Sequence, residues 1–327
     1  MIYIYAMQSF EDLSKKFVSY FDKRHFPEQP ASLYEPNEYF LQNGGKRIRP
    51  VLCLMGHELF GNINDETMHL ATAFELFHNF TLIHDDIMDN APLRRGIETV
   101  QNKFGSNTAL LAGDVMLIAA YKELAHIHVD RLPAILQLFN RTATQVCEGQ
   151  QLDMDFESQE NVSMDAYLEM ITLKTSVALA ASLQAGAILG GADSADLDKI
   201  YAFGKALGIA FQMQDDYLDA FGNPEKFGKQ IGGDILANKK TFLLLYTLQK
   251  ASPTQLQELR SFMQNEANNK VEKVIQLFKD CGVDDWAMSM QNKYLKEAFA
   301  QLDAITVDTK RKEPLKKLAL NLLHREV

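Results

Sequence analysis

The sequence predicts an all-α protein that forms a single domain over residues 1–327. Three observations carry this prediction. Long stretches place apolar residues at the three- and four-residue intervals of a helix, no run alternates as a half-buried strand would, and only nine prolines and 18 glycines interrupt the chain. No shift in composition marks a linker, so we expect one domain rather than the two that length alone suggests.

The predicted helices follow one another with short breaks between them. The breaks fall at turn-forming positions such as Gly44-Gly45, Asn90 to Pro92, Gly190-Gly191 and Gly232-Gly233. Residues 174–190 are rich in alanine, serine and glycine, which suits a tightly packed central helix. The predicted helical segments are 66–90, 107–126, 132–156, 164–191, 197–221, 236–250 and 254–280.

The bulk composition is that of an ordinary globular protein, with 46% hydrophobic and 23% charged residues. A formal net charge of −10 and the lack of a basic stripe argue against binding to nucleic acid. The same charge repels anionic ligands at long range, so any anion must be captured by local cations.

The three cysteines and the N-terminus bear on the compartment. Cys53, Cys147 and Cys281 lack the spacing of a metal site, and we expect them to be buried small side chains in a reducing compartment. The first residues, MIYIYAMQSFEDLSKK, lack the basic region and cleavage site of a signal peptide. No uninterrupted apolar run reaches the 18 residues of a spanning helix. We therefore expect a cytoplasmic protein without a membrane span.

Two copies of one acidic pattern, Asp-Asp-x-x-Asp, lie 130 residues apart. The first comprises Asp85, Asp86 and Asp89, and the second comprises Asp215, Asp216 and Asp219. Residues i and i+4 share a helix face about 6 Å apart along the axis, so the outer carboxylates of each copy repel unless a cation lies between them. Mg²⁺ uses one or two carboxylates and completes its shell with water and phosphate oxygens. Two such clusters facing each other would hold a diphosphate between metal ions.

A single motif of this kind is common on solvated helix faces and carries little weight alone. Here each copy follows an apolar stretch, AFELFHNFTLI before the first and YAFGKALGIAFQM before the second. Matched copies in matched contexts favour a metal-dependent site over surface charge.

Clusters of basic residues accompany both acidic motifs in this otherwise acidic chain. Arg94 and Arg95 follow the first motif in a Pro-to-Gly loop that suits bidentate phosphate recognition. A second basic loop, GGKRIRP at 44–50, packs three cations behind a diglycine but lacks the spacing of a P-loop. After the second motif, FGKQIGGDILANKKT contains Lys229, Asp234, Lys239 and Lys240. His78 lies on the same helical stripe as Asp85, where the alternative is a buried histidine of the core.

These segments resemble the trans-isoprenyl diphosphate synthases, also called polyprenyl synthetases. The similarity rests on GGKRIRP, HDDIMD with LRRG, Lys174-Thr175, FQMQDDYLD and GKQIGGDI with NKK, in order, from about residue 35 to about 250. It implies an isoprenoid synthase-type helical bundle around a deep central cavity, normally a homodimer. It also implies head-to-tail condensation of isopentenyl diphosphate with an allylic diphosphate, without a side-chain nucleophile or base.

The resemblance implies a role for each residue that matches a family motif. Ligands to three Mg²⁺ ions would be Asp85, Asp89 and Asp215, supported by Asp86, Asp216 and Asp219. The allylic diphosphate would be bound by Arg94, Lys174, Lys229 and Lys239. The isopentenyl diphosphate would be bound by Lys46, Arg49, His78 and Arg95. Groups flanking the developing carbocation would be Thr175 and Gln212, and a further cavity pattern matches Gln150 and Asp153.

Product length is predicted from the two residues that lie four and five positions before Asp85. These are Thr81 and Phe80, which would form the floor of the cavity that receives the growing chain. Short-product family members carry bulky aromatics there, and long-chain members carry small residues. One Phe beside a Thr favours geranylgeranyl diphosphate, with farnesyl diphosphate as the alternative. The other reading of Phe80 is that it only packs against a neighbouring helix.

Three alternatives use parts of the same pattern. His84-Asp85 is the dipeptide of the HD-type metal phosphohydrolases, which need further His and Asp ligands. A class I terpene cyclase shares the first motif but usually has an Asn/Ser/Glu triad where this chain has Asp215 to Asp219. A non-catalytic regulatory paralogue tends to lose aspartates, and this chain retains all six.

Overall fold

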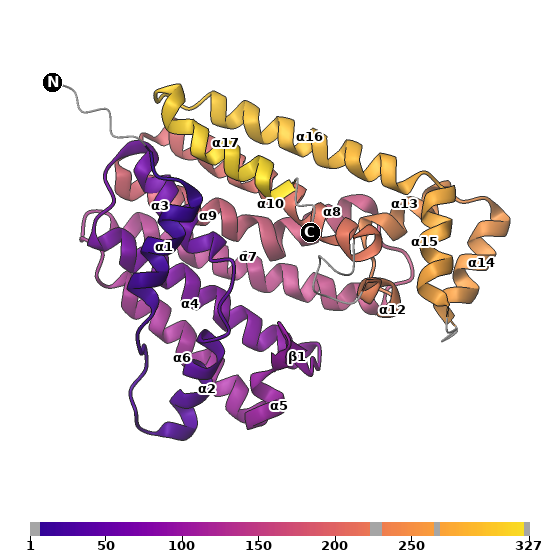
Figure 1. Cartoon of the computed structure of the whole chain (residues 1–327), viewed down its shortest axis with the longest axis horizontal. Helices are drawn as coiled ribbons and strands as arrows, with labels where there is room; N and C mark the ends of the chain where they lie inside the picture. The colour runs from indigo at the N-terminus through magenta and orange to yellow at the C-terminus, as the bar shows by residue number, and fades with distance from the viewer. Residues whose placement is uncertain (1–6, 223–230, 265–268, 324–327) are drawn as a thin grey trace. The chain divides into compact units, whose positions relative to one another are not determined.

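The computed structural model describes residues 7–222, 231–264 and 269–323. The regular structure of these residues is helical, apart from one hairpin of two-residue strands (Figure 1). The prediction of an all-α protein is therefore confirmed. Backbone contacts divide the chain into two compact units. Unit 1 comprises Met1–Phe139 with Ser182–Asp198, and unit 2 comprises Asn140–Ala181 with Lys199–Val327. A single domain over the whole chain stays a prediction.

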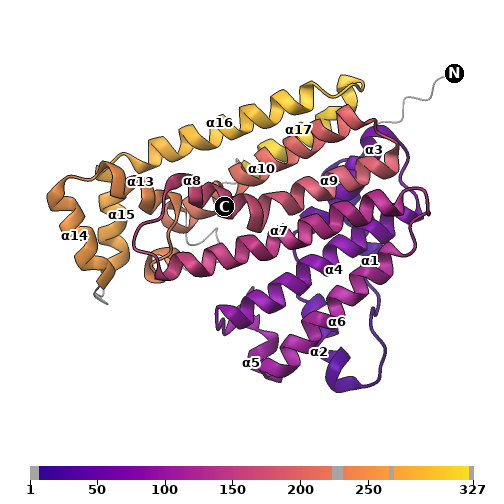
Figure 2. The ribbon, with the colours of Figure 1, turned by 180° about the vertical axis from the view of Figure 1, so that it is seen from behind.

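Unit 1 is built around α4, a helix of 24 residues that packs along α6 (Figures 1 and 2). A capping box between Asn64 and Thr67 starts α4, and Asn90, with a φ of 49°, follows its end. The elements confined to this unit are α1 (Phe10–Phe21), α2 (Ala31–Leu41), α3 (Ile48–Phe60), α4 (Asp65–Met88), β1 (Leu93–Arg94), β2 (Ile97–Glu98), α5 (Val100–Phe104) and α6 (Ser106–Leu124).

The hairpin follows α4 directly and gives a defined shape to the loop that contains the paired arginines. Leu93 pairs with Glu98 and Arg94 pairs with Ile97. The two turn residues have positive φ angles, 53° for Arg95 and 82° for Gly96, as a type I′ turn requires. The sequence analysis predicted a loop here, because Pro-Leu-Arg-Arg-Gly lacks the alternation of a longer strand.

Unit 2 contains the C-terminal helices and most of two long helices. Its elements include α8 (Met164–Ile171), the π-helical turn η1 (Thr172–Ser176), α12 (Gly233–Leu236), α13 (Phe242–Lys250), α14 (Pro253–Gln264), α15 (Lys270–Asp280), α16 (Val283–Asp303) and α17 (Thr309–Leu323). Three helices contain dividing points between the units, namely α7 (Leu132–Ser158), α9 (Val177–Gly190) and α10 (Ser194–Phe221).

The predicted helix boundaries needed correction at two places in unit 2. The segment predicted as one helix over 236–250 begins with the last residue of α12, Leu236, and continues as a separate helix, α13, from Phe242. Asn238 between them adopts a left-handed φ of 53°, which interrupts the helix. The segment predicted over 254–280 is two helices, α14 and α15.

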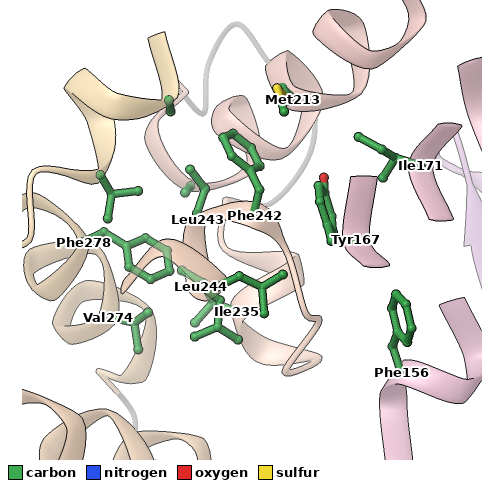
Figure 3. Packing of buried hydrophobic residues seen from close by; sticks show 14 of the residues in the cluster. Phe156, Tyr167, Ile171, Met213, Ile235, Phe242, Leu243, Leu244, Val274 and Phe278 are labelled. Atoms are coloured by element: carbon green, nitrogen blue, oxygen red, sulfur yellow. The ribbon is translucent and has the colours of Figure 1, made fainter. Parts of the chain in front are cut away.

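A hydrophobic cluster in unit 2 connects α8, α10, α13, α15 and α16. Figure 3 shows Tyr167 beside Phe242, with Leu243, Leu244, Val274 and Phe278 nearby. Phe242 is fully buried and Tyr167 is 2% exposed. Full burial of one such side chain contributes about 1.5–3 kcal/mol, so this cluster holds the surrounding helix ends firmly.

One helical stretch of the described chain, Met164–Gly190, is long and apolar enough to cross a membrane. However, 72% of its most apolar window is buried inside the protein, as expected for the core helix predicted from its small residues. The prediction of three buried cysteines is wrong for Cys147, which is exposed on α7, and Cys281 is partly exposed. Their spacing carried no information about which helix face they occupy.

Candidate active site

The first acidic motif occupies the last turn of α4 and the residue that caps it. Asp86 is buried, Asp85 is half-buried and Asp89 is exposed. Three carboxylates thus gather at the negative end of the helix dipole, and no basic residue lies in that turn. This arrangement is electrostatically unfavourable unless cations are supplied from elsewhere.

Arg94 supplies one such cation from the hairpin. Its Nε donates to Oδ1 of Asp86 at 2.8 Å, and its Nη2 lies 3.4 Å from Oδ2 of Asp85. Burial raises the pKa of Asp86 to about 6, although Arg94 opposes the shift. Within the described part of the chain, Oδ2 of Asp86 is buried without a hydrogen-bond partner. Arg94 was predicted to bind diphosphate, and in this structure it neutralises the aspartates.

The carboxylates fit a hard cation that also binds other ligands. Asp85 and Asp89 offer partly exposed oxygens, and Asp86 has the unpartnered oxygen behind them. No three Asp, Glu, His or Cys side chains of the described ranges converge closely enough to enclose a metal by themselves. This donor set suits Mg²⁺, which takes few carboxylates and keeps positions for water and phosphate.

A basic cluster lies in the same unit and joins residues far apart in sequence. Nη1 of Arg49, on α3, is 3.0 Å from Nε2 of His78, on α4. Because the guanidinium can only donate, the imidazole accepts through Nε2 and is neutral. Burial, together with Arg49, Arg95 and other arginines, lowers the pKa of His78 well below its ordinary value. Burial also lowers the pKa of Arg49 to about 10.

The hairpin turn packs on the diglycine loop beside this cluster. Nη1 of Arg95 donates to the carbonyl of Gly44. A Cβ on Gly45 would lie 2.8 Å from that same nitrogen, so the absence of a side chain permits the approach. Lys46, the next residue, is exposed. The structure therefore brings the loop before Lys46 to Arg95, as it brings Arg49 to His78.

Arg47 belongs to the fold, unlike Lys46 and Arg49 of the same basic loop, which were predicted to bind a substrate. It precedes α3 with a left-handed φ of 48° and pairs with Glu75 in the interior. The exposed side-chain fractions are 8% for Arg47 and 5% for Glu75. A buried ion pair of this kind leaves Arg47 no reach toward a ligand, so the loop provides two cations and not three.

The second acidic motif lies near the end of α10 in unit 2. Asp215 and Asp219 are half-buried, whereas Asp216 is buried. Asp216 accepts a hydrogen bond from the Tyr167 hydroxyl at 2.6 Å and another from Nε2 of Gln212 at 2.9 Å. Burial and the nearby Asp234 raise the pKa of Asp216 to about 8, against the effect of both hydrogen bonds. A divalent cation at the neighbouring Asp215 would favour the ionised form.

Asp219 organises the chain that follows the motif. Its main-chain carbonyl accepts from the amide of Gly232 at 2.7 Å, and its Oδ2 accepts from the amide of Asp234 at 3.0 Å. These bonds fix the start of α12 and thereby the segment that leads to Lys239. Nζ of Lys239 lies 3.9 Å from Oδ1 of Asp234. Lys229 lies outside the described residues.

A π-helical turn presents Lys174 and Thr175. Gly149 of α7 and Gly208 of α10 both contact this turn closely. A Cβ on Gly149 would lie 2.2 Å from the amide nitrogen of Lys174, and one on Gly208 would lie 2.6 Å from Cα of Ser176. The tight packing stabilises a wide turn of the kind often found at functional sites.

The side chains of this turn are held by hydrogen bonds. Nζ of Lys174 donates to Asp153 at 2.6 Å, and Oγ1 of Thr175 donates to Oε1 of Gln212 at 3.1 Å. Asp153 was identified from its family pattern, and this ion pair shows what it contacts. Gln150, from the same pattern, is half-buried on α7.

A cavity of about 110 Å³ joins these groups in unit 2. Six of the predicted residues line it, namely Asp153, Lys174, Thr175, Gln212, Asp216 and Lys239. Tyr167 and Asp234 line it as well. The sequence analysis missed Tyr167, although its position seven residues before Lys174 placed both on one helical face.

The residues predicted to set product length lie one turn before Asp85. Oγ1 of Thr81 donates to the carbonyl of His78 at 2.8 Å. The ring of Phe80 lies 5.9 Å from that of Phe77 and 4.8 Å from that of His84. At 100° per residue, Thr81 is about 40° from Asp85 around the helix and Phe80 about 140°.

His84 packs between helices and does not join the acidic motif. Its Nε2 lies 3.1 Å from the carbonyl of Leu110 on α6, and Gly113 leaves room for the ring. An HD-type metal centre would require His84 as a ligand beside Asp85. The observed packing gives the imidazole a structural role in the contact between α4 and α6.

Comparison with known proteins identifies the family. The polyprenyl synthetase family model matches residues 30–281. A geranylgeranyl diphosphate synthase of Methanosarcina mazei is 36% identical over 301 residues, 91% of each chain. A geranylfarnesyl diphosphate synthase of Natronomonas pharaonis is 32% identical over 296 residues, 85% of this chain and 86% of the relative.

Solved structures agree with this assignment. A crystal structure of a geranylgeranyl pyrophosphate synthase is 41% identical, with a TM-score of 0.93 over 98% of this chain and 100% of that one. The similarity extends well beyond the motifs and includes the C-terminal helices, where the sequence contains no recognised family motif. The chain therefore belongs to the polyprenyl synthetase family, and it is a short-chain trans-prenyltransferase.

Proposed function

We propose that this protein is a geranylgeranyl diphosphate synthase. It would condense isopentenyl diphosphate with an allylic diphosphate and repeat the step until a product of 20 carbons is reached. The observation that best supports this proposal is the arrangement that the two acidic motifs share, one in each unit. Carboxylates with partly exposed oxygens, Asp85 and Asp215, lie in motifs whose middle residues, Asp86 and Asp216, are buried and hydrogen-bonded by the protein.

The residues of unit 2 would bind and ionise the allylic substrate. Lys174 and Lys239 line one cavity and would contact its diphosphate. Lys229 and Arg94 match the family positions for the same ligand. Bound Mg²⁺, three ions in the family pattern, would neutralise the charge that develops on the departing diphosphate. Asp85, Asp89 and Asp215 would hold the metal, and Asp86, Asp216 and Asp219 would keep those ligands in place.

The basic cluster of unit 1 would bind isopentenyl diphosphate. Arg49 and His78 already contact each other, and Arg95 packs on the loop that ends at Lys46. The neutral His78 can donate from Nδ1 to a phosphate oxygen, which requires no proton uptake. No side-chain base is needed, because the departing diphosphate can accept the proton lost after condensation.

Phe80 supports a product of intermediate length. One aromatic ring at this level, braced by Phe77 and His84, would limit the depth available to the growing chain. Thr81 beside it leaves more room than a second ring would. Farnesyl diphosphate remains the shorter alternative, and a relative that makes a 25-carbon product marks the longer one.

A homodimer would cover an exposed apolar stripe on α6. Leu111 and Ile118 lie two helical turns apart on one face and are 55% and 54% exposed. Leu110, beside them, is 49% exposed. Large apolar side chains clustered on one helix face are typical of an interface, and a second copy of this chain would bury them.

The test is a product assay with defined substrates. The purified protein is incubated with isopentenyl diphosphate, Mg²⁺ and dimethylallyl, geranyl or farnesyl diphosphate, and products are separated by chain length. We expect 20-carbon diphosphate from each starter. Farnesyl diphosphate as the end product would correct the length, a cyclic hydrocarbon would indicate a terpene cyclase, and no product from any starter would indicate a non-catalytic paralogue.

A further inference from the structure

Four side chains of unit 2 form a continuous chain of hydrogen bonds that ends at the cavity. The hydroxyl of Tyr167 donates to Oδ2 of Asp216 at 2.6 Å, and Nε2 of Gln212 donates to Oδ1 of Asp216 at 2.9 Å. Oγ1 of Thr175 then donates to Oε1 of Gln212 at 3.1 Å. All four residues line the same cavity.

This chain determines which way the amide of Gln212 points. Oδ1 of Asp216 accepts from Nε2 of Gln212, so the NH₂ group of that amide faces Asp216 and its carbonyl faces Thr175. The Thr175 hydroxyl then donates to that carbonyl, which leaves the oxygen lone pairs available to the cavity. Oxygen atoms presented in this way stabilise positive charge, whereas a hydroxyl hydrogen pointing into the cavity would oppose it.

Both ends of the chain are anchored by packing. Tyr167 is 2% exposed, and its ring stacks on that of Phe242 at 6.1 Å between centroids, as Figure 3 shows. Thr175 belongs to the π-helical turn held against Gly149 and Gly208. With the ends fixed, the middle of the chain is adjustable only through Asp216 and Gln212, and the Tyr167 hydroxyl restrains Asp216.

We propose that Tyr167 is a positioning residue for the prenyl-transfer reaction, acting through Asp216 to hold Gln212 and Thr175 with their oxygens toward the developing allylic cation. This inference rests on the proposed function. Tyr167 directs its hydroxyl hydrogen to Oδ2 of Asp216, so it would act through that residue and not on a ligand directly. Its loss should therefore slow ionisation without weakening the binding of either substrate.

The test removes only the hydroxyl, with Tyr167→Phe. We expect kcat to fall roughly tenfold or more, because the carboxyl group of Asp216 loses the hydrogen bond that the Tyr167 hydroxyl donates to it. The KM values for both substrates should stay within about twofold, because the variant leaves the lysines and arginines that would bind the diphosphates in place. Tyr246→Phe is the matched control, since Tyr246 packs against the same hydrophobic cluster and stacks on Trp286. It should keep the wild-type kcat.

A double-mutant cycle separates positioning from a general structural effect. If Tyr167 acts through Gln212, Tyr167→Phe should add little to the loss of kcat caused by Gln212→Ala. Additive losses or an unchanged kcat in Tyr167→Phe would each overturn the proposal.

Two further measurements keep the result interpretable. Circular dichroism establishes that Tyr167→Phe is folded. Should it not fold, Gln212→Glu tests the same geometry, because a carboxylate cannot donate to Asp216, and a normal kcat there would overturn the proposal. An inactive wild-type protein would instead refute the proposed function, which is a different outcome.

Discussion

At the scale of single residues, the two acidic motifs divide their carboxylates in the same way. The middle aspartate of each, Asp86 or Asp216, is buried and bonded by the protein, while Asp85 and Asp215 keep contact with solvent. Adjacent helical residues differ by about 100° in direction, so one can face the interior while its neighbour faces out. The pattern Asp-Asp therefore supplies one buried carboxylate and one that is partly exposed.

The two partly exposed aspartates, Asp85 and Asp215, should be required for turnover. We expect Asp85→Ala and Asp215→Ala to reduce kcat roughly 10²–10³-fold or more, because each removes an anchor for the cations that stabilise the leaving group. The melting temperature should change little, since both side chains are partly exposed. EDTA should abolish the wild-type activity and Mg²⁺ restore it. Activity that survives EDTA would refute the metal-dependent mechanism.

The two diphosphates should respond to different substitutions. Arg49→Ala and His78→Ala should raise the KM for isopentenyl diphosphate, whereas Lys174→Ala and Lys239→Ala should impair the allylic substrate. Each charge-assisted contact is worth about 1.5–3 kcal/mol, roughly ten- to hundredfold. The KM for each substrate is measured by titrating that substrate at a saturating level of the other. The reverse pattern would exchange the two sites. Lys205→Ala, an exposed lysine on α10 that does not line the cavity, provides a control for the loss of a lysine.

Product length should depend on the side chain at position 80. Phe80→Ala should shift the product beyond 20 carbons, because it removes the ring that Phe77 and His84 brace. Thr81→Phe should shift it the other way, toward 15 carbons. Chromatography of the dephosphorylated products distinguishes these results. If Phe80→Ala leaves the distribution unchanged, Phe80 only packs between helices.

At the scale of elements, the π-helical turn η1 depends on glycines in two neighbouring helices. The backbones approach closely at this turn, and Lys174 and Thr175 within it both line the cavity. The diglycine loop at Gly44 similarly lets the hairpin turn approach α3. In both places a glycine, which has no side chain, leaves room for a neighbouring element to approach.

Adding one methyl group should disturb this turn. Gly149→Ala would place a Cβ 2.2 Å from the amide nitrogen of Lys174, so the turn or α7 must move. Overpacking of this kind costs about 1–3 kcal/mol, and we expect a lower melting temperature together with a loss of kcat. Thr144→Ala, at an exposed position of the same helix, should change neither quantity. Normal activity in Gly149→Ala would show that η1 tolerates displacement.

At the scale of the whole molecule, self-association should depend on the stripe on α6. Ile118→Lys should convert a dimer to a monomer in light scattering, because it places charge in an apolar interface. Val129→Lys is the matched control, since Val129 is 71% exposed but lies beyond the end of α6. A wild-type protein that is monomeric at micromolar concentration would refute the dimer.

The sequence alone determined the fold class and the family. Helical periodicity predicted the long helices 66–90 and 132–156 within two residues of α4 and α7, because each carries a continuous apolar face. The resemblance identified a family that the comparisons confirm. The resemblance also implied roles for Lys174, Thr175, Gln212, Asp216 and Lys239, which the structure places around one cavity.

Only the tertiary structure decided which charges belong to the fold and which are available to a ligand. Arg47 and Arg49 are two residues apart and chemically alike, yet one pairs with Glu75 in the interior and the other reaches His78. Tyr167 became visible only because α8 brings its hydroxyl to Asp216, 49 residues away. Such pairings depend on the left-handed turn before α3 and on the packing of α8 against α10. Sequence spacing describes the face of one helix, whereas the partner of that face is chosen by packing.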